Sequence, residues 1–361
     1  MSAGFVPPPY PYDRLEEIIK IANEHDGGAV DLSIGTPADP APEDVVAALA
    51  AAGTARGYPA SIGTPQLRRA AAGWISRRLG VVLDPGTEIA ACVGSKEFVA
   101  SLPQYLRLRD PSRDTVLYPA ISYPTYEMGA LLASCRAVAY HHLDDIPEED
   151  AARALCAWVN SPANPTGELH DLDAAARWGR ARGVPVFSDE CYAEFTWTGA
   201  PTTILRSGTA GVIAVHSLSK RDNFAGARIG FYAGDPGLVH YLREVRKHAG
   251  LMPAGPVQAA AVLALGEDSH VEVQRARYWR RMLRLQQILL AAGYPVGLPD
   301  GAFYLWVPAD DAWLAARELA RRAGIVVSPG EFYGRSSHSF FRVAAVATED
   351  RIEVAAGRLG L

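Results

Sequence analysis

Short runs of apolar and β-branched residues alternate along the chain with longer segments of helical periodicity. Four such runs lie at Thr115–Tyr118, Ala157–Val159, Val184–Phe187 and Val212–Val215, and the segment Leu172–Arg182 has the period of a helix. The runs are apolar at successive positions, so they fit strands that are covered on both faces. The pattern predicts an α/β fold with a mainly parallel, mixed central sheet.

The C-terminal part of the chain has a different pattern. Ser269–Ala292 predicts a long, Arg-rich amphipathic helix, and short strands are expected near Ala302–Val307 and Ser339–Val343. Together with the Pro-rich start and a helix over Arg14–Glu24, this part is expected to form a smaller α+β domain. The predicted division is a large domain over residues 42–265 and a discontinuous small domain over residues 1–41 and 266–361.

Composition and charge exclude several classes of partner. The 361 residues are 49% hydrophobic and 21% charged, and the net charge of −5 gives no sign of a nucleic-acid partner. The four cysteines stand singly, which argues against disulfides and against a zinc site, so no metal is expected. No leader pattern and no apolar stretch of membrane-spanning length is present. The sequence predicts a cytoplasmic protein that binds neither nucleic acid nor membranes.

The strongest chemical motif follows the apolar run Val212–Val215. It has the form SxSKxxxxxGxRxG and places Ser217, Ser219, Lys220 and Arg228 close together in sequence. A lysine that forms a Schiff base must be held in place with its amine partly deprotonated. The two hydroxyls and the arginine can bind a phosphate. A lone lysine is more often a solvated loop residue, but the whole motif favours the functional interpretation.

A second motif contains Asp189 and Tyr192. It begins directly after the run Val184–Phe187, at the carboxyl end of a predicted strand, where open α/β sheets bind their ligands. The carboxylate of Asp189 can keep a pyridine nitrogen protonated, and the phenol of Tyr192 can donate to a ring oxygen. Asp189 could instead be a helix N-cap. Its combination with the lysine motif favours the cofactor role.

Two weaker motifs follow other predicted strands. The segment Asn160–Gly167 is rich in turn residues, which alone predicts only a turn, yet it places Asn164 at the same sheet edge. The Asn164–Pro165 bond is a candidate cis peptide. The sequence Gly94-Ser95-Lys96 opens a helical segment whose first amides can bind phosphate, although Ser95 could also be a plain N-cap.

Together these motifs resemble the class I/II aminotransferases, the aspartate aminotransferase family of fold type I, over nearly the whole chain. The resemblance implies pyridoxal 5′-phosphate as cofactor, with Lys220 as the Schiff-base lysine and proton shuttle. Asp189 would bind the pyridine nitrogen, and Tyr192 and Asn164 the ring oxygen. The remaining cofactor contacts implied by the resemblance are Gly94, Ser95, Lys96, Ser217, Ser219 and Arg228 at the phosphate and Tyr123 on the ring face.

The resemblance also concerns assembly and substrate. Tyr58 matches a tyrosine that reaches the phosphate of the neighbouring subunit, which implies a homodimer with shared active sites. Arg342 matches the arginine that binds the substrate α-carboxylate, and Gly35 matches the glycine beside which the substrate lies. Asn164 is expected to contact the substrate as well. The implied substrates are amino acids and keto acids.

Several phrases, among them Asp31–Pro37 and Val245–Gly250, are similar to actinobacterial N-succinyldiaminopimelate aminotransferases. That subgroup transfers the amino group of glutamate to N-succinyl-2-amino-6-oxopimelate in lysine biosynthesis. Asp222 and Ala227 depart from the expected small polar and aromatic residues beside the lysine, which leaves the substrate open.

Other functions stay possible at this point. They include β-elimination, cyclisation or a secondary-metabolite transamination on the same scaffold. A non-catalytic ligand sensor is a further alternative, although such proteins usually carry a DNA-binding domain, for which there is no room before Arg14. Lys96 and Arg221 are cations near the predicted site, and the sequence leaves open whether either meets a distal carboxylate.

Overall fold

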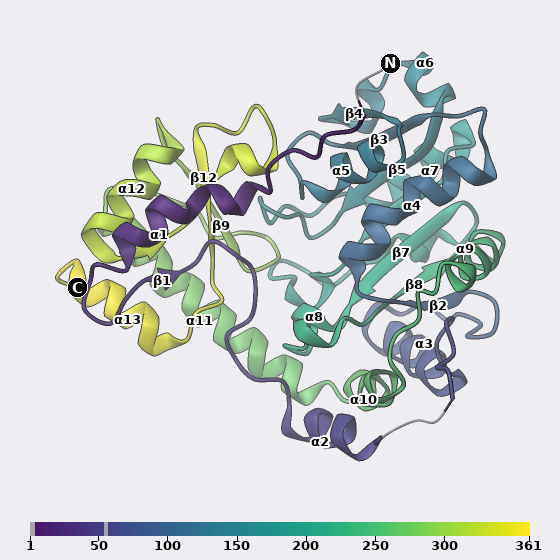
Figure 1. Cartoon of the computed structure of the whole chain (residues 1–361), viewed down its shortest axis with the longest axis horizontal. Coiled ribbons are helices and arrows are strands. Elements are labelled where there is room, and N and C mark those ends of the chain that lie inside the picture. The colour runs from purple at the N-terminus through teal and green to yellow at the C-terminus, as the bar shows by residue number, and fades with distance from the viewer. Residues whose placement is uncertain (1–3, 54–56) are drawn as a thin grey trace.

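The computed structural model describes residues 4–53 and 57–361, which form two lobes joined along the middle of the molecule (Figure 1). The larger lobe is built on a seven-stranded sheet with the order β2-β8-β7-β6-β5-β3-β4. Strand β8 is antiparallel to both neighbours, whereas the other neighbouring pairs are parallel. This confirms the predicted α/β fold with a mixed, mainly parallel sheet. The strands are β2 (Ile89–Cys92), β3 (Thr115–Pro119), β4 (Arg136–Tyr140), β5 (Ala154–Asn160), β6 (Val186–Asp189), β7 (Val212–Ser217) and β8 (Gly230–Gly234).

Helices cover both faces of this sheet. Residues of β7 alternate between two apolar clusters, with Ile213 and Val215 facing α4, α5 and α9, and Val212 and Ala214 facing α3, α7 and α10. Burial on both faces explains why the strands are apolar at successive positions. The helices of this lobe are α2 (Glu43–Ala51), α3 (Pro65–Leu79), α4 (Ser95–Arg109), α5 (Thr125–Leu132), α6 (Glu148–Ala152), α7 (Leu172–Arg182), α8 (Leu218–Arg221), α9 (Pro236–His248) and α10 (Gly255–Gly266).

The local sequence accounts for where these elements begin and end. Helix α7 begins after Asp171, whose side chain accepts from the Ala174 amide, and it ends at Gly183, which has the left-handed φ of 62° that glycine adopts without strain. The strand expected from Val184 begins only at Val186 because Pro185 has no N–H to donate. The predicted Asn164–Pro165 cis bond is present, and Ser161–Pro162 is also cis.

The smaller lobe has a three-stranded antiparallel sheet of order β11-β12-β9 and a two-stranded parallel sheet of β1 and β10. Its apolar core draws on residues 15–32 and 278–356, together with Tyr192 and Phe195 from the larger lobe. Its elements are η1 (Pro11–Leu15), α1 (Glu16–Ala22), β1 (Val30–Asp31), α11 (Ser269–Ala291), β9 (Tyr304–Pro308), α12 (Ala312–Ala323), β10 (Ile325–Val326), β11 (Ser328–Pro329), η6 (Gly330–Tyr333), β12 (Phe340–Ala344) and α13 (Glu349–Arg358). We propose that residues 42–265 form the large domain and that residues 1–41 and 266–361 form the small domain.

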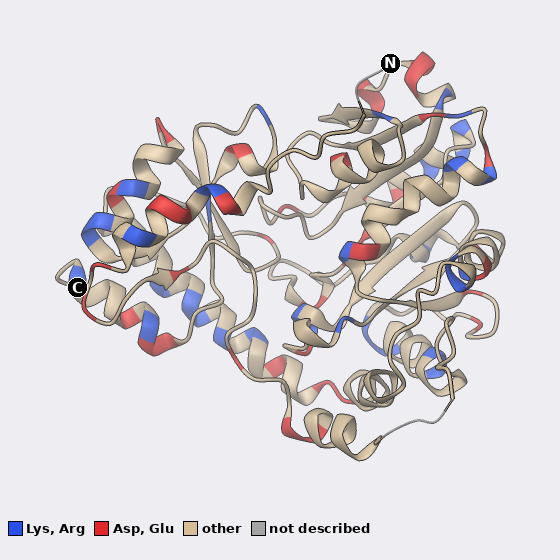
Figure 2. Ribbon diagram, in the orientation of Figure 1, with Lys and Arg blue, Asp and Glu red and all other residues tan. Residues whose placement is uncertain are grey.

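Charged residues are distributed unevenly over these elements. Figure 2 shows that the strands of the central sheet carry few charges, whereas basic residues recur along α11, whose one acidic residue, Glu272, lies in its first turn. Helix α11 runs from the region of α10 into the smaller lobe (Figure 1). No helix in the described part of the chain has both the length and the apolar character needed to span a bilayer.

Candidate active site

A cavity of about 380 Å³ lies at the carboxyl ends of β5, β6 and β7, and both lobes contribute to its walls. This is the edge at which open α/β sheets bind ligands. The structure therefore brings together residues that lie more than 300 positions apart in sequence, such as Gly35 and Arg342. The predicted site residues that line it are Gly35, Ser95, Lys96, Tyr123, Asn164, Asp189, Tyr192, Ser217, Ser219, Lys220, Arg228 and Arg342.

Lys220 is placed by the junction between β7 and α8. The Ser217 hydroxyl accepts from the Ser219 amide at 3.1 Å and caps the short helix that carries the lysine. The Lys220 amine donates to the Gly35 carbonyl across the cavity. Burial lowers the pKa of this amine to about 8, and the positive charges of Arg342 and Arg228 act in the same direction. A useful fraction of the amine is therefore an uncharged nucleophile near neutral pH.

Asp189 ends strand β6 on the other side of the cavity. Its Oδ2 accepts from the Tyr126 hydroxyl at 2.9 Å, and its Oδ1 accepts from the Cys191 amide at 3.2 Å. Burial raises the pKa of this carboxyl group. A protonated pyridine nitrogen beside Asp189 would counteract this effect and keep the carboxylate ionised.

Arg342 reaches the cavity from β12 and is 2% exposed. One guanidinium nitrogen donates to Asn164 Oδ1 at 2.7 Å, and the other donates to the Ser33 carbonyl at 2.6 Å. Its Nε is buried without a partner. The guanidinium stacks on Tyr304, 4.1 Å from the ring centroid. The described residues place no carboxylate within ion-pair distance of it, so the arginine is set up to bind an anion from outside the chain.

The phosphate end of the predicted site is formed by Arg228 and the start of α4. Gly94 has a φ of 81°, and a Cβ at this position would lie 2.3 Å from Arg228 Nη2, so a side chain would displace the arginine. The first amides of α4, beginning with Ser95, have no partners within the helix and can bind phosphate. Amine, carboxylate, arginine and helix start thus provide groups that fit pyridoxal 5′-phosphate.

Tyr58 lies outside the cavity. It is 97% exposed, and no described residue of the same chain covers it. A single chain therefore gives this tyrosine no role, and its contact with the phosphate of a partner subunit stays a prediction.

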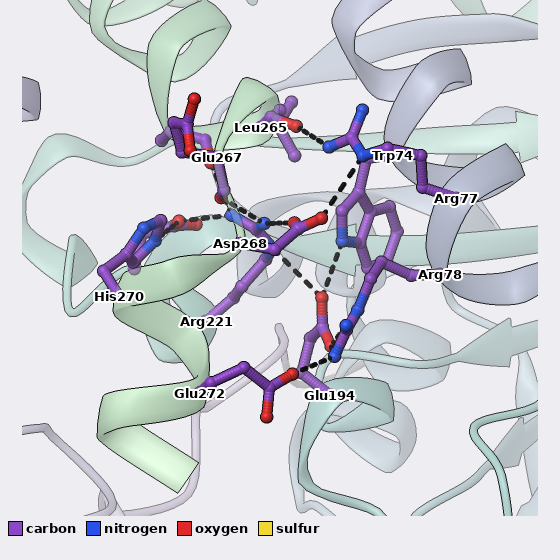
Figure 3. Close-up of polar contacts among 12 residues, drawn as sticks. Trp74, Arg77, Arg78, Glu194, Arg221, Leu265, Glu267, Asp268, His270 and Glu272 are labelled. Carbon is purple, nitrogen blue, oxygen red and sulfur yellow. Dashed lines mark hydrogen bonds and ion pairs between the residues drawn. The ribbon is translucent and has the colours of Figure 1, made fainter.

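Arg221, the residue after Lys220, also lies outside the cavity, in a buried polar cluster (Figure 3). Its guanidinium binds Glu194 at 3.3 Å, Asp268 at 2.6 Å and Asp222. His270 contacts the same oxygen of Asp222 at 2.7 Å. The departure at position 222 is thus part of this cluster and does not reach the cavity.

Ala227, the second residue that differs from the expected pattern, also lies outside the cavity. Ala227 does not line the cavity, whereas Ala225 does. Neither Ala227 nor Asp222 lines the cavity, and the identity of the substrate stays open.

Several tyrosines that line the cavity were not predicted from the sequence. Tyr10 and Tyr12 come from the N-terminal segment, Tyr126 binds Asp189, and the Tyr304 hydroxyl lies 2.8 Å from that of Tyr192. The sequence signal for one of them was that Tyr126 lies three residues after Tyr123, in the same motif. Tyr304 lies in a predicted strand and has no motif of its own.

The fold and the cavity together define an aminotransferase. The model of the family "Aminotransferase class I and II" matches residues 28–359, and the chain belongs to this family. It is a transferase of the EC 2.6.1 type that uses pyridoxal 5′-phosphate and acts on amino acid and keto acid substrates.

Individual relatives differ in the substrates for which they are named. The chain is 43% identical to the 4-dedimethylamino-4-oxo-anhydrotetracycline transaminase OxyQ of Streptomyces rimosus, over 98% of this chain and 99% of OxyQ. It is 32% identical to the LL-diaminopimelate aminotransferase of Aquifex aeolicus, over 98% and 96% of the two chains. The solved structure of a probable N-succinyldiaminopimelate aminotransferase from Thermus thermophilus has a TM-score of 0.85 at 28% identity, covering 97% of this chain and 99% of that one. The relatives do not confirm a special closeness to the N-succinyldiaminopimelate subgroup.

Proposed function

We propose that this protein transfers an amino group from glutamate to a keto acid, with Lys220 as the catalytic lysine. The observation that carries the proposal is the position of its amine, which shares one cavity with the buried carboxylate of Asp189 and the uncompensated guanidinium of Arg342. Pyridoxal 5′-phosphate, when bound, withdraws electrons from the substrate α-carbon and accepts the amino group.

The residues of the chain supply the proton transfers and the orientation. Lys220 Nζ takes a proton from the α-carbon of the amino donor and would pass it to the cofactor carbon that carries the amino group. In the second half of the reaction it moves a proton in the opposite direction, onto the α-carbon of the product. A base positioned in this way is worth about 10²- to 10⁴-fold in rate. Asp189 keeps the proton on the cofactor ring nitrogen. Tyr192 and Asn164 donate to the ring oxygen, while Arg228 and the start of α4 bind the phosphate.

Substrate binding is assigned to Arg342 and to groups that line the cavity with it. Arg342 takes the α-carboxylate with two parallel hydrogen bonds, and Asn164 and Gly35 line the same end. Lys96 is a further cation in the cavity, and its described polar partner is the Tyr10 hydroxyl at 3.2 Å. With no carboxylate of the described chain bound to it, Lys96 suits the second carboxylate of glutamate.

The first acceptor to test is N-succinyl-2-amino-6-oxopimelate, in lysine and diaminopimelate biosynthesis. A ketone of secondary metabolism is the second candidate, because the identity to OxyQ, at 43%, exceeds that to the LL-diaminopimelate aminotransferase, at 32%. The aromatic walls formed by Tyr10 and Tyr12 favour a flat acceptor of that kind.

A half-reaction screen separates these possibilities. Glutamate, LL-diaminopimelate and aromatic amines are added singly to the protein loaded with pyridoxal 5′-phosphate, and the visible absorbance of the lysine-bound cofactor is followed. Glutamate should bleach this absorbance with release of 2-oxoglutarate. Each acceptor is then added to the aminated form, and the product is identified by mass. If no amino acid changes the absorbance, the proposed function is wrong.

We further propose a homodimer in which Tyr58 of one subunit completes the site of the other. Light scattering of the cofactor-loaded protein should give twice the chain mass. The Tyr58→Phe variant should release pyridoxal 5′-phosphate faster than the parent protein at an unchanged molar mass. A monomer that retains full activity would contradict this assembly.

A further inference from the structure

Tyr304 places a buried hydroxyl next to the predicted ring-oxygen ligand. Its oxygen lies 2.8 Å from that of Tyr192, and both side chains are buried. The two rings meet edge to face, with centroids 5.4 Å apart. Tyr304 comes from β9 in the small lobe, whereas Tyr192 follows β6 in the large lobe, so this hydrogen bond joins the lobes inside the cavity.

Counting protons fixes the direction of this hydrogen bond when the cofactor is bound. Burial raises the pKa of both phenols, so each keeps its single proton at neutral pH. If the proton of Tyr192 is donated to the cofactor ring oxygen, Tyr192 has only acceptor capacity left for its neighbour. Tyr304 must then be the donor to Tyr192.

The same side chain contacts two other predicted site residues. The Arg342 guanidinium lies over the Tyr304 ring, which fixes its plane. A Cβ at Gly35 would lie 2.1 Å from the Tyr304 oxygen, so only glycine leaves room for this hydroxyl. The carbonyl of that glycine accepts from the Lys220 amine. Tyr304 therefore touches the arginine, the glycine and the phenol from one position.

We propose that Tyr304 is a positioning residue of the transamination site, whose hydroxyl donates to Tyr192 and directs the Tyr192 proton to the cofactor ring oxygen while its ring orients Arg342. The proposal rests on the function proposed above. The donated hydrogen bond polarises the Tyr192 hydroxyl, because hydrogen bonds in a chain strengthen one another. The hydroxyl and the ring have separate effects, so two substitutions can distinguish them.

The test for the hydroxyl is a spectrophotometric pH titration of the lysine-bound cofactor. A donor to the ring oxygen stabilises the more negative, deprotonated form, so its loss raises the pH at which the visible absorbance titrates. Tyr192→Phe should give the larger upward shift. Tyr304→Phe should give a smaller one, about 0.2 to 0.7 pH units. The double variant should titrate with Tyr192→Phe alone, since Tyr304 acts through Tyr192.

The test for the ring is the Michaelis constant for glutamate. Tyr304→Phe keeps the aromatic face and should change this constant by less than about twofold, whereas Tyr304→Leu removes the face and should raise it about 2- to 10-fold. Tyr278→Phe is the control. It also removes the hydroxyl of a buried tyrosine in the small-lobe core, but that hydroxyl contacts Asn223, at 3.5 Å, and not Tyr192. It should shift neither the titration nor the Michaelis constant.

The outcomes separate the two proposals. If Tyr192→Phe shifts the titration but Tyr304→Phe does not, or if the two shifts add in the double variant, the inference about Tyr304 is overturned while the proposed function stands. If the parent protein shows no lysine-bound absorbance at all, the proposed function itself fails.

Discussion

Two buried arginines lie close to Lys220, and their surroundings are opposite. Arg221, 4% exposed, is bound by the carboxylates of Glu194, Asp222 and Asp268 and by two backbone carbonyls (Figure 3). Arg342, 2% exposed, is bound by neutral oxygens and aromatic faces, and its Nε has no partner. One arginine is fully compensated within the chain, whereas the other is not.

This difference indicates a structural role for Arg221 and a ligand-binding role for Arg342. Burying a guanidinium costs several kcal/mol unless anions compensate it. The cluster around Arg221 supplies that compensation and holds α8, α3 and the start of α11 together. The uncompensated Arg342 persists because the fold holds it in place, and in the proposed function a substrate carboxylate completes its coordination. An arginine of the first kind should matter for stability, and one of the second kind for substrate binding.

The largest effect is expected from Arg221→Ala. Its loss leaves three acidic side chains without their shared counterion, which should lower the free energy of unfolding by about 3–5 kcal/mol in urea titrations. The matched control is Arg77→Ala, which removes an exposed arginine that also binds Asp268, at 3.2 Å, and should cost no more than about 1 kcal/mol. Equal losses in the two variants would contradict a structural role for the buried cluster.

Arg342→Ala should have the converse effect. Losing the carboxylate partner should reduce kcat/KM for glutamate by about 10²- to 10³-fold, mainly through KM. Unfolding stability should fall far less than in Arg221→Ala, because no carboxylate of the chain is left unpaired. Urea titration and steady-state kinetics on both variants check the contrast. A stability loss as large as that of Arg221→Ala would remove the distinction between the two arginines.

The pH dependence of Lys220 sharpens the comparison, because Arg342 is one cause of its lowered pKa. In the cofactor-free protein, labelling of this amine by acetic anhydride should rise about tenfold per pH unit below pH 8 and level off above it. Arg342→Ala should move this midpoint upward, whereas Arg221→Ala should leave it in place. Mass spectrometry of the Lys220 peptide gives the rate, with exposed Lys247 as internal reference. A midpoint near that of a free lysine would refute the effect of burial.

The smallest effect is expected from Trp74→Phe. The Trp74 indole donates to Glu194 Oε1 at 2.7 Å at the edge of the Arg221 cluster. Its loss should cost about 1 kcal/mol of unfolding free energy, since Glu194 keeps its two arginine partners. Thermal unfolding measures this loss. A change in KM for glutamate would indicate that the cluster reaches the substrate after all.

The sequence predicts the four parallel strands β3, β5, β6 and β7 of the central sheet, and the edge at which the cavity lies, because both follow from local patterns. Lys220, Asp189 and Asn164 each follow an apolar strand, and parallel strands bring their carboxyl ends to one edge. Arg342 could be assigned only through the resemblance, because an isolated arginine near the C-terminus has no local signal. Its position depends on the packing of one lobe against the other.

The tyrosines show the limit of local patterns. Tyr304 and Tyr12 occupy ordinary positions in sequence, and only the tertiary structure places both against Arg342. In the same way, Asp222 reads as a departure beside the lysine until His270 and Arg221 are seen to bind it. Such partners lie too far apart in sequence for spacing to reveal them.

The central claim is that the amine of Lys220 binds the cofactor covalently, and reduction with borohydride tests it most directly. Protein loaded with pyridoxal 5′-phosphate is reduced, digested and analysed by peptide mass spectrometry. We expect one adduct per chain, on the peptide that contains Lys220, and none in the Lys220→Ala variant. An adduct on another lysine, or a reduced protein without any adduct, would contradict the account.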